Sequence, residues 1–168
     1  EAKLAGVNLL MNKPMFRSSL ISAFNQALGI KEAEKEEPEE EEFDLSGKRI
    51  LLAEDNAINR QVANEILQSS GVSVEPAGDG LEAVEKLWEG GYDAVLMDIQ
   101  MPNMNGYEAA RAIRSLERAD AGNIPIIAMT ANAFAEDVQA ALEAGMTAHI
   151  AKPIDLGILL FELNRILR

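Results

Sequence analysis

From residue 50 onward, short apolar runs alternate with stretches of helical periodicity. Five runs have the length of β-strands, and they cover residues 50–53, 72–74, 94–97, 124–129 and 148–150. After each run, apolar side chains recur every three or four residues, which is the spacing of one face of an α-helix. The five predicted helices carry these apolar positions: Ile58, Val62 and Ile66; Leu81, Val84, Leu87 and Trp88; Tyr107, Ala110 and Ile113; Phe134, Val138, Ala141 and Leu142; Leu159, Leu163, Ile166 and Leu167.

Strands that alternate with helices favour right-handed crossovers and a parallel sheet covered on both faces. The run at 72–74 reads Val-Ser-Val and alternates, so we expect it at an edge of the sheet. The run at 94–97 is apolar throughout and is expected in the centre. The pattern predicts an α/β fold with a doubly wound five-stranded parallel sheet of order 2-1-3-4-5.

The composition limits the kinds of site that the chain can build. Its 168 residues include no cysteine and one histidine, His149, which excludes disulfides, thiolate metal sites and centres held by several histidines. The net charge is −13, and we expect no nucleic-acid partner, because phosphate contacts need clustered lysines and arginines. No apolar run reaches the roughly 18 residues of a membrane span, so we expect no membrane contact by this fragment. The lack of cysteine fits a cytoplasmic location.

Charge is concentrated before the first strand. Residues 31–44 hold eight Glu, one Asp and two Lys, a net charge of −9 + 2 = −7. Such a run repels itself and cannot bury apolar surface. We therefore expect an acidic linker over residues 31–47.

Residues 1–30 repeat the last part of the chain. With a shift of 139 positions, eight of the 27 positions from 2 to 28 are identical, among them Gly6, Lys13 and Pro14. These identities predict the last strand and helix of an upstream sister domain. The sequence also begins with Glu1, so we expect a fragment of a longer protein, in which this remnant (1–30) and the linker (31–47) precede one complete domain (48–168).

Polar side chains stand at the carboxyl ends of four predicted strands. Glu54 and Asp55 follow the first strand, Asp98 the third, Thr130 the fourth and Lys152 the fifth. Ligand and reaction sites in doubly wound sheets form outside these strand ends, where the strand order reverses. The first and third strands are predicted neighbours, about 4.8 Å apart, so three carboxylates must crowd one edge. Their repulsion, on the order of a few kcal/mol, requires a compensating cation.

A pocket lined by oxygen atoms, without His or Cys, suits Mg²⁺. Lys152 lies two strands from Asp98, about 10 Å across the sheet, within reach of a long side chain. Thr130 is one strand away and offers a hydroxyl. A carboxylate, a metal, an ammonium and a hydroxyl are the groups that hold the three equatorial oxygens in phosphoryl transfer, which is the chemistry that the set predicts.

Four motifs resemble the response-regulator receiver domain of two-component signalling: I-L-L-A-E-D-N at 50–56, V-L-M-D-I-Q-M-P at 95–102, I-A-M-T-A at 127–131 and A-K-P at 151–153. The resemblance covers residues 48–168 and implies a flavodoxin-like receiver fold. Residues 1–30 are similar to the end of a preceding receiver. Such a tandem resembles the C-terminal part of a hybrid sensor histidine kinase, which would be a transferase and a phosphoprotein whose cytoplasmic part contains this segment.

The resemblance implies a phosphorelay chemistry centred on Asp98. Asp98 would accept a phosphoryl group from a phosphohistidine, carried by the dimerisation and phosphoacceptor domain of a histidine kinase or by a histidine phosphotransfer protein. Mg²⁺ would be held by Asp55, Asp98 and the backbone carbonyl of Gln100, with Glu54 acting directly or through water. The fragment itself would catalyse only its own aspartyl phosphorylation and slow dephosphorylation.

The resemblance also implies a conformational switch. Lys152 would pair with the phosphoryl oxygens, and Thr130 would donate a hydrogen bond to them and shift inward on phosphorylation. Gln100 and Asn132 occupy positions that tune the rate of hydrolysis. His149 stands where the family has Tyr or Phe, in a position that turns inward behind the moving threonine.

Two other functions stay open at this point. An interaction module with the receiver fold but without phosphotransfer is expected to lack the phosphoacceptor or the lysine, and both are present. A phosphatase similar to the haloacid dehalogenases needs a second Asp two positions after the nucleophile, where this chain has Gln100. Dimerisation is also left open, since the helix of Phe134 and Val138 and the last helix could each present an exposed apolar face.

Overall fold

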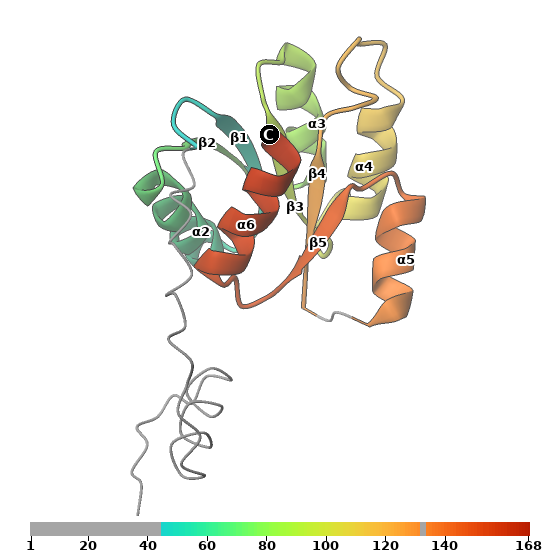
Figure 1. The fold of residues 1–168 in the computed structure, drawn as a ribbon. Helices are drawn as coiled ribbons and strands as arrows, with labels where there is room; N and C mark the ends of the chain where they lie inside the picture. Colours follow the sequence, from blue (N-terminus) through green and yellow to red (C-terminus); the bar gives the residue numbers. More distant parts are fainter. Residues whose placement is uncertain (1–44, 132–133) are drawn as a thin grey trace, which may run out of the picture. The chain divides into compact units, whose positions relative to one another are not determined.

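The computed structural model describes residues 45–131 and 134–168, which form a five-stranded parallel sheet in the order β2-β1-β3-β4-β5 (Figure 1). The strands are β1 (Arg49–Ala53), β2 (Ser73–Ala77), β3 (Ala94–Asp98), β4 (Ile126–Thr130) and β5 (Ala148–Ala151). The predicted fold class and strand order are confirmed. Because β1 pairs with both β2 and β3, the strand order reverses between β1 and β3, at the place where such sheets bind ligands.

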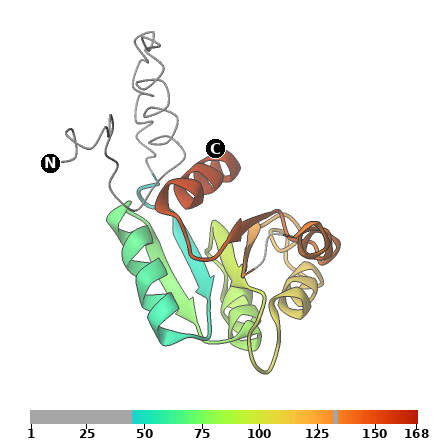
Figure 2. The same cartoon turned by 90° about the horizontal axis from the view of Figure 1, so that it is seen from below.

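Helices cover both faces of the sheet (Figure 2). The helices are α2 (Ala57–Ser69), α3 (Gly80–Glu89), α4 (Gly106–Arg114), α5 (Ala135–Glu143) and α6 (Leu156–Leu167). The buried side chains of α2 and α6 share one core with Ile50 and Leu52 of β1, and those of α3, α4 and α5 share the other core with Leu51 and Ala53. Successive residues of a strand point to opposite faces, so β1 supplies both cores.

Side chains at the strand ends begin four of the helices. Asn56, Asp79, Asn105 and Asp155 are the N-caps of α2, α3, α4 and α6, and each accepts hydrogen bonds from backbone N–H groups of the first turn. Such a cap is worth about 1 kcal/mol. At the start of α6, Oδ1 of Asp155 accepts a hydrogen bond of 3.0 Å from the N–H of Ile158.

Some apolar positions on the helices lie outside the core. In α2 the buried residues are Ala63 and Leu67, whereas Ile58 is 73% exposed and Val62 is 50% exposed. Trp88 at the end of α3 is also largely exposed. The periodic spacing of apolar residues therefore located these helices correctly. In α2, however, the apolar residues named in the prediction lie next to the face that is buried, and not on it.

Two strand boundaries differ from the prediction by more than one residue. Strand β2 continues past residue 74 to Ala77 and includes Pro76, which an edge strand tolerates because one side of its backbone needs no hydrogen bond. Strand β4 begins at Ile126 and not at residue 124. Ile124 is nevertheless buried, in the turn that leads into the strand.

Several expectations fall on other parts of the chain. The receiver-like remnant (1–30), nearly all of the acidic linker and Asn132 lie outside the described residues. Within residues 45–131 and 134–168, no helix is long and apolar enough to cross a membrane.

Candidate functional site

The register of the sheet brings the predicted polar residues together at one edge. Ala53 pairs with Met97, so the residues that follow them, Glu54 and Asp98, emerge side by side from β1 and β3. Thr130 is the last residue of β4, and Lys152 comes directly after β5. Asp55, Gln100 and all four of these residues line one cavity of about 290 Å³ at the carboxyl ends of the strands.

Three carboxylates lie close together in this cavity. Glu54, Asp55 and Asp98 each offer an oxygen within 4.8 Å of the other two. Glu54 and Asp98 are buried, at 1% and 5% exposure, whereas Asp55 is exposed. Oxygen donors with one side open to water fit Mg²⁺, which retains several water ligands when proteins bind it.

Lys152 supplies the cation that these carboxylates require. Its Nζ lies 2.5 Å from Oε2 of Glu54 and 2.8 Å from Oδ2 of Asp98. Burial lowers the pKa of the ammonium, but the hydrogen bonds to Asp98 and Glu54 outweigh that effect and leave the pKa above its ordinary value. Lys152 is therefore charged at neutral pH, and its long side chain spans β4 as the sequence predicts.

Glu54 is engaged by the protein through both of its oxygens. Oε2 accepts from Lys152, and Oε1 accepts from the backbone N–H of Asn56 (3.2 Å) and from Nδ2 of Asn59 (3.3 Å). Of the three carboxylates, that of Asp55 is the exposed one and is the most open to a ligand. Glu54 thus orients the ammonium of Lys152, a contact that the sequence did not predict.

Asp98 is held in a shielded position at the end of β3. Burial raises the pKa of its carboxyl, and the hydrogen bond from Lys152 opposes part of that rise. Oδ1 accepts a hydrogen bond of 3.3 Å from the backbone N–H of Gln100, and Oδ2 faces Lys152. The carboxylate is therefore oriented from both sides while it still borders the cavity.

The loop after Asp98 folds back closely on the strand. The backbone N–H of Gly106 donates to the carbonyl of Ile99 at 2.9 Å. A side chain at Gly106 would collide with the backbone carbonyl of Asp98. Glycine at this position lets α4 begin directly against the strand end that carries Asp98.

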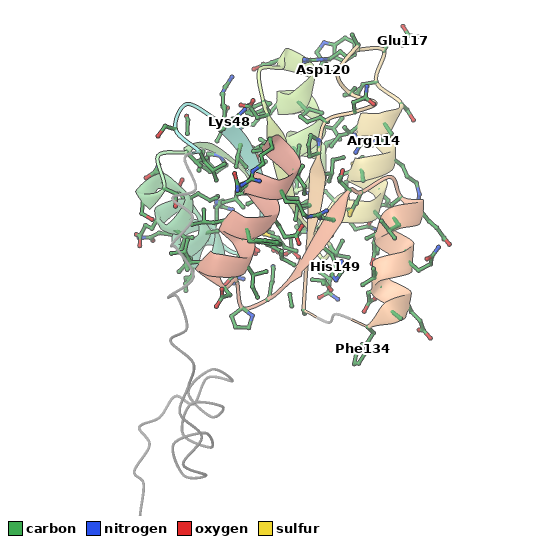
Figure 3. The ribbon with its side chains drawn as sticks, in the orientation of Figure 1. Lys48, Arg114, Glu117, Asp120, Phe134 and His149 are labelled. Carbon is green, nitrogen blue, oxygen red and sulfur yellow. The ribbon has the colours of Figure 1, made fainter. Side chains whose placement is uncertain are left out.

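Thr130 and His149 lie on the far side of Asp98 from β1. Thr130 is 8% exposed at the end of β4. His149 is half-buried on β5, paired with Ala128, on the side that faces α5 (Figure 3). The roles of these two residues in a switch stay predictions.

The cavity is also lined by Asn59, Tyr107 and Asp137, which the sequence did not assign to the site. They lie in the first turns of α2, α4 and α5, the helices that follow β1, β3 and β4. The signal that could have found them is their position, because the segments that follow strand ends surround the site in this kind of sheet.

Comparisons of the sequence and the structure with known proteins all indicate the same family. The sequence model of the response regulator receiver domain matches residues 50–164. Hybrid signal transduction histidine kinase B of Dictyostelium discoideum is 39% identical over 124 residues, which is 68% of this chain and 6% of that protein. The chain therefore spans a small part of this relative.

Solved structures are similar over the described domain. The receiver domain of the sensor histidine kinase PA1611 of Pseudomonas aeruginosa, with magnesium in its active-site cleft, is 41% identical with a TM-score of 0.67, over 73% of this chain and 98% of that one. The receiver domain of yeast Ssk1, in complex with the histidine phosphotransfer protein Ypd1, is 31% identical with a TM-score of 0.66, over 71% of this chain and 88% of that one. The match to the family model, across more than half of the sequence, shows that this chain belongs to the response regulator receiver domain family.

Proposed function

We propose that this domain accepts a phosphoryl group from a phosphohistidine onto Asp98 in a reaction that depends on Mg²⁺. The observation that carries the proposal is the placement of the Asp98 carboxylate: Oδ2 lies 2.8 Å from the Lys152 ammonium, and Asp55 offers an oxygen within 4.8 Å of an Asp98 oxygen. One side of the phosphoacceptor thus meets a fixed cation, and the other meets a carboxylate suited to a metal.

The residues predicted from the sequence have distinct parts in the transfer. An oxygen of Asp98 attacks phosphorus, the N–P bond of the phosphohistidine breaks, and the imidazole leaves with the electron pair and takes up a proton. The Lys152 ammonium exchanges the Asp98 oxygen for a phosphoryl oxygen and keeps its hydrogen bond to Glu54. Asp55, Asp98 and the carbonyl of Gln100 would hold Mg²⁺, with Glu54 acting directly or through water. When bound, the ion neutralises charge on the phosphoryl oxygens.

A second set of residues would determine the lifetime of the phosphorylated state. The hydroxyl of Thr130 donates to the phosphoryl group and draws the end of β4 inward, and His149 follows in the place of the usual aromatic residue. Gln100 borders the cavity and is exposed, which supports a role in admitting the water that hydrolyses the aspartyl phosphate. Asn132 would also tune this rate.

The surface next to the cavity supports a helical partner. A phosphohistidine must approach within bonding distance of Asp98, so the surroundings of the cavity become an interface. Ile58 and Val62 are exposed there on α2, and Val62 lines a neighbouring groove of about 380 Å³ with Pro153 and Ile154. An apolar helix face fits such a groove. The partner would be the phosphoacceptor domain of a histidine kinase or a histidine phosphotransfer protein, and no nucleic acid.

The chain is, in this proposal, part of a hybrid histidine kinase. The curated relatives support that assignment, as does the repeat at residues 1–30, which would end a preceding receiver. The acidic segment 31–47 would separate that receiver from the one at 48–168. The parent would act in the cytoplasm as a transferase, and this fragment would react only at its own aspartate.

Binding of a phosphoryl mimic tests the proposal. Mg²⁺ with beryllium trifluoride should stabilise the wild-type domain by about 2.7 kcal/mol when the free ligand is at a hundred times its dissociation constant. Asp98→Asn lacks the carboxylate that bonds beryllium and should not respond. A wild-type melting temperature that is unchanged by the pair would contradict phosphotransfer and favour an interaction module.

A further inference from the structure

One wall of the cavity carries an acidic residue that the proposed chemistry leaves without a role. Asp137, in the first turn of α5, and Tyr107, in the first turn of α4, line the same cavity as Asp98. These two helices lie next to each other on one side of the sheet (Figure 1). The wall that they form stands apart from Glu54 and Asp55, which follow β1.

The charge of Asp137 is not compensated. Within the described parts of the chain, its carboxylate has no hydrogen bond or ion pair, in contrast to Glu54 and Asp98, which share Lys152. Burial, and after it the negative charge of Asp137, raises the pKa of the Tyr107 hydroxyl. The carboxylate therefore acts electrostatically on the interior of the cavity.

A stabilising effect on the helix explains why an acidic residue lies in the first turn of α5. It does not explain why the side chain of Asp137 lines the cavity. Glu136 and Asp137 both lie in the first turn of α5, where a negative charge favours the helix by about 0.3–1 kcal/mol. Glu136 is exposed and does not line the cavity, whereas Asp137 is half-buried and does. The two residues thus form a matched pair that separates the effect on the helix from the effect on the cavity.

We propose that Asp137 is a specificity-determining residue, which favours phosphodonors whose leaving group is a protonated nitrogen over donors that leave as an anion. This inference rests on the proposed phosphotransfer to Asp98. An incoming phosphohistidine must place its imidazole in the part of the cavity that the phosphoryl group does not fill. A carboxylate there accepts a hydrogen bond from the ring N–H and stabilises the imidazolium form.

The balance of the step shows why the leaving group matters. When the N–P bond breaks, its electron pair stays on the nitrogen, and a ring protonated at its other nitrogen leaves as neutral imidazole. A carboxylate that favours this protonation lowers the barrier to transfer. When the O–P bond of acetyl phosphate breaks, the electron pair stays on an oxygen and the product is acetate, which the same carboxylate repels.

Rates with three small phosphodonors test the inference. N-phosphoimidazole and phosphoramidate carry nitrogen leaving groups, and acetyl phosphate carries acetate. Labelling of Asp98 by each donor, in Mg²⁺, is measured for the wild type, Asp137→Asn, Asp137→Ser and the control Glu136→Gln. We expect both Asp137 variants to react about tenfold more slowly than the wild type with the two nitrogen donors, which is the effect of one charge at close range. Their rates with acetyl phosphate should be no lower than that of the wild type. The control should keep the wild-type ratio of rates.

The outcomes separate this inference from the proposed function. If the wild type is labelled but the ratio of rates is unchanged in the Asp137 variants, or if all donors slow equally, the assignment of Asp137 is overturned. If no donor labels the wild type, the phosphotransfer proposal itself fails. Two variants are used so that a folding defect in one, seen in its melting temperature, still leaves a reading from the other.

Discussion

The ammonium of Lys152 joins the carboxylates of Glu54 and Asp98, at 2.5 Å and 2.8 Å, and so ties the ends of β1 and β3 to the segment that follows β5. Strand β4 lies between β3 and β5 in the sheet. One side chain therefore connects non-neighbouring strands across the site. This contact compensates the charge of the two buried carboxylates.

Loss of this ammonium should weaken the fold. Lys152→Ala leaves two buried carboxylates without a counter-ion, and removal of one partner of such a cluster costs about 3 kcal/mol. We expect that decrease in the free energy of unfolding, measured by urea denaturation in EDTA. The double variant Lys152→Met/Glu54→Gln removes both charges of one ion pair, so it should recover part of the lost unfolding free energy. Equal stability of Lys152→Ala and the wild type would show that the cluster does not need the cation.

A single methyl group at Gly106 should disturb Asp98. In Gly106→Ala the new Cβ meets the backbone carbonyl of Asp98, so the loop or the strand end must move. We expect a loss of about 1–3 kcal/mol in unfolding free energy and slower labelling of Asp98. Gly122→Ala is the matched control, because a Cβ at Gly122 has open space around it. Similar behaviour of the two variants would refute the close fit.

The exposed stripe on α2 should matter only for a protein donor. Val62→Asp places an unpaired charge in the proposed interface, and we expect kcat/KM for transfer from a phosphorylated histidine phosphotransfer protein to fall about tenfold or more. Labelling by acetyl phosphate should be unchanged. Leu81→Asp changes a comparably exposed side chain on α3, at 47% against 50%, and serves as the control. Equal loss in both variants would argue against α2 as the docking face.

The two tyrosines should ionise at unusually high pH. Burial, and then a hydrogen bond with Glu75, raises the pKa of Tyr92 to about 12, and the pKa of Tyr107 is also raised. Because the folded state favours the protonated phenol, this contribution to stability is present below the unfolded pKa of about 10 and is lost as the pH rises towards 12. Absorbance at the phenolate band should rise later in the native protein than in urea. Tyr92→Phe should remove the latest step.

Sequence reasoning predicted the fold and the meeting of the strand ends for the same physical reason. Parallel strands end at a common edge, so the strand pattern alone brings Asp55, Asp98 and Lys152 together. It did not predict which partner each side chain takes, because side-chain contacts such as Lys152 with Glu54 depend on local geometry. Spacing also could not distinguish the buried Leu67 from the exposed Val62, since both lie on apolar stripes of α2.

The cavity wall shows a second limit of pattern reasoning. Tyr107 was predicted only as part of an apolar helical stripe, although it also lines the cavity. Asp137 is one of several acidic residues in a helix and has no distinctive motif. Their position became evident only when the first turns of α4 and α5 were placed at the carboxyl edge of the sheet.

The central claim is tested most directly by the site of covalent labelling. The wild-type domain, incubated with phosphoramidate and Mg²⁺ and analysed by mass spectrometry, should carry one labile phosphoryl group on the peptide that contains Asp98. The group should be absent in EDTA and in Asp98→Asn. A phosphoryl group on another residue, or none on the wild type, would contradict the account.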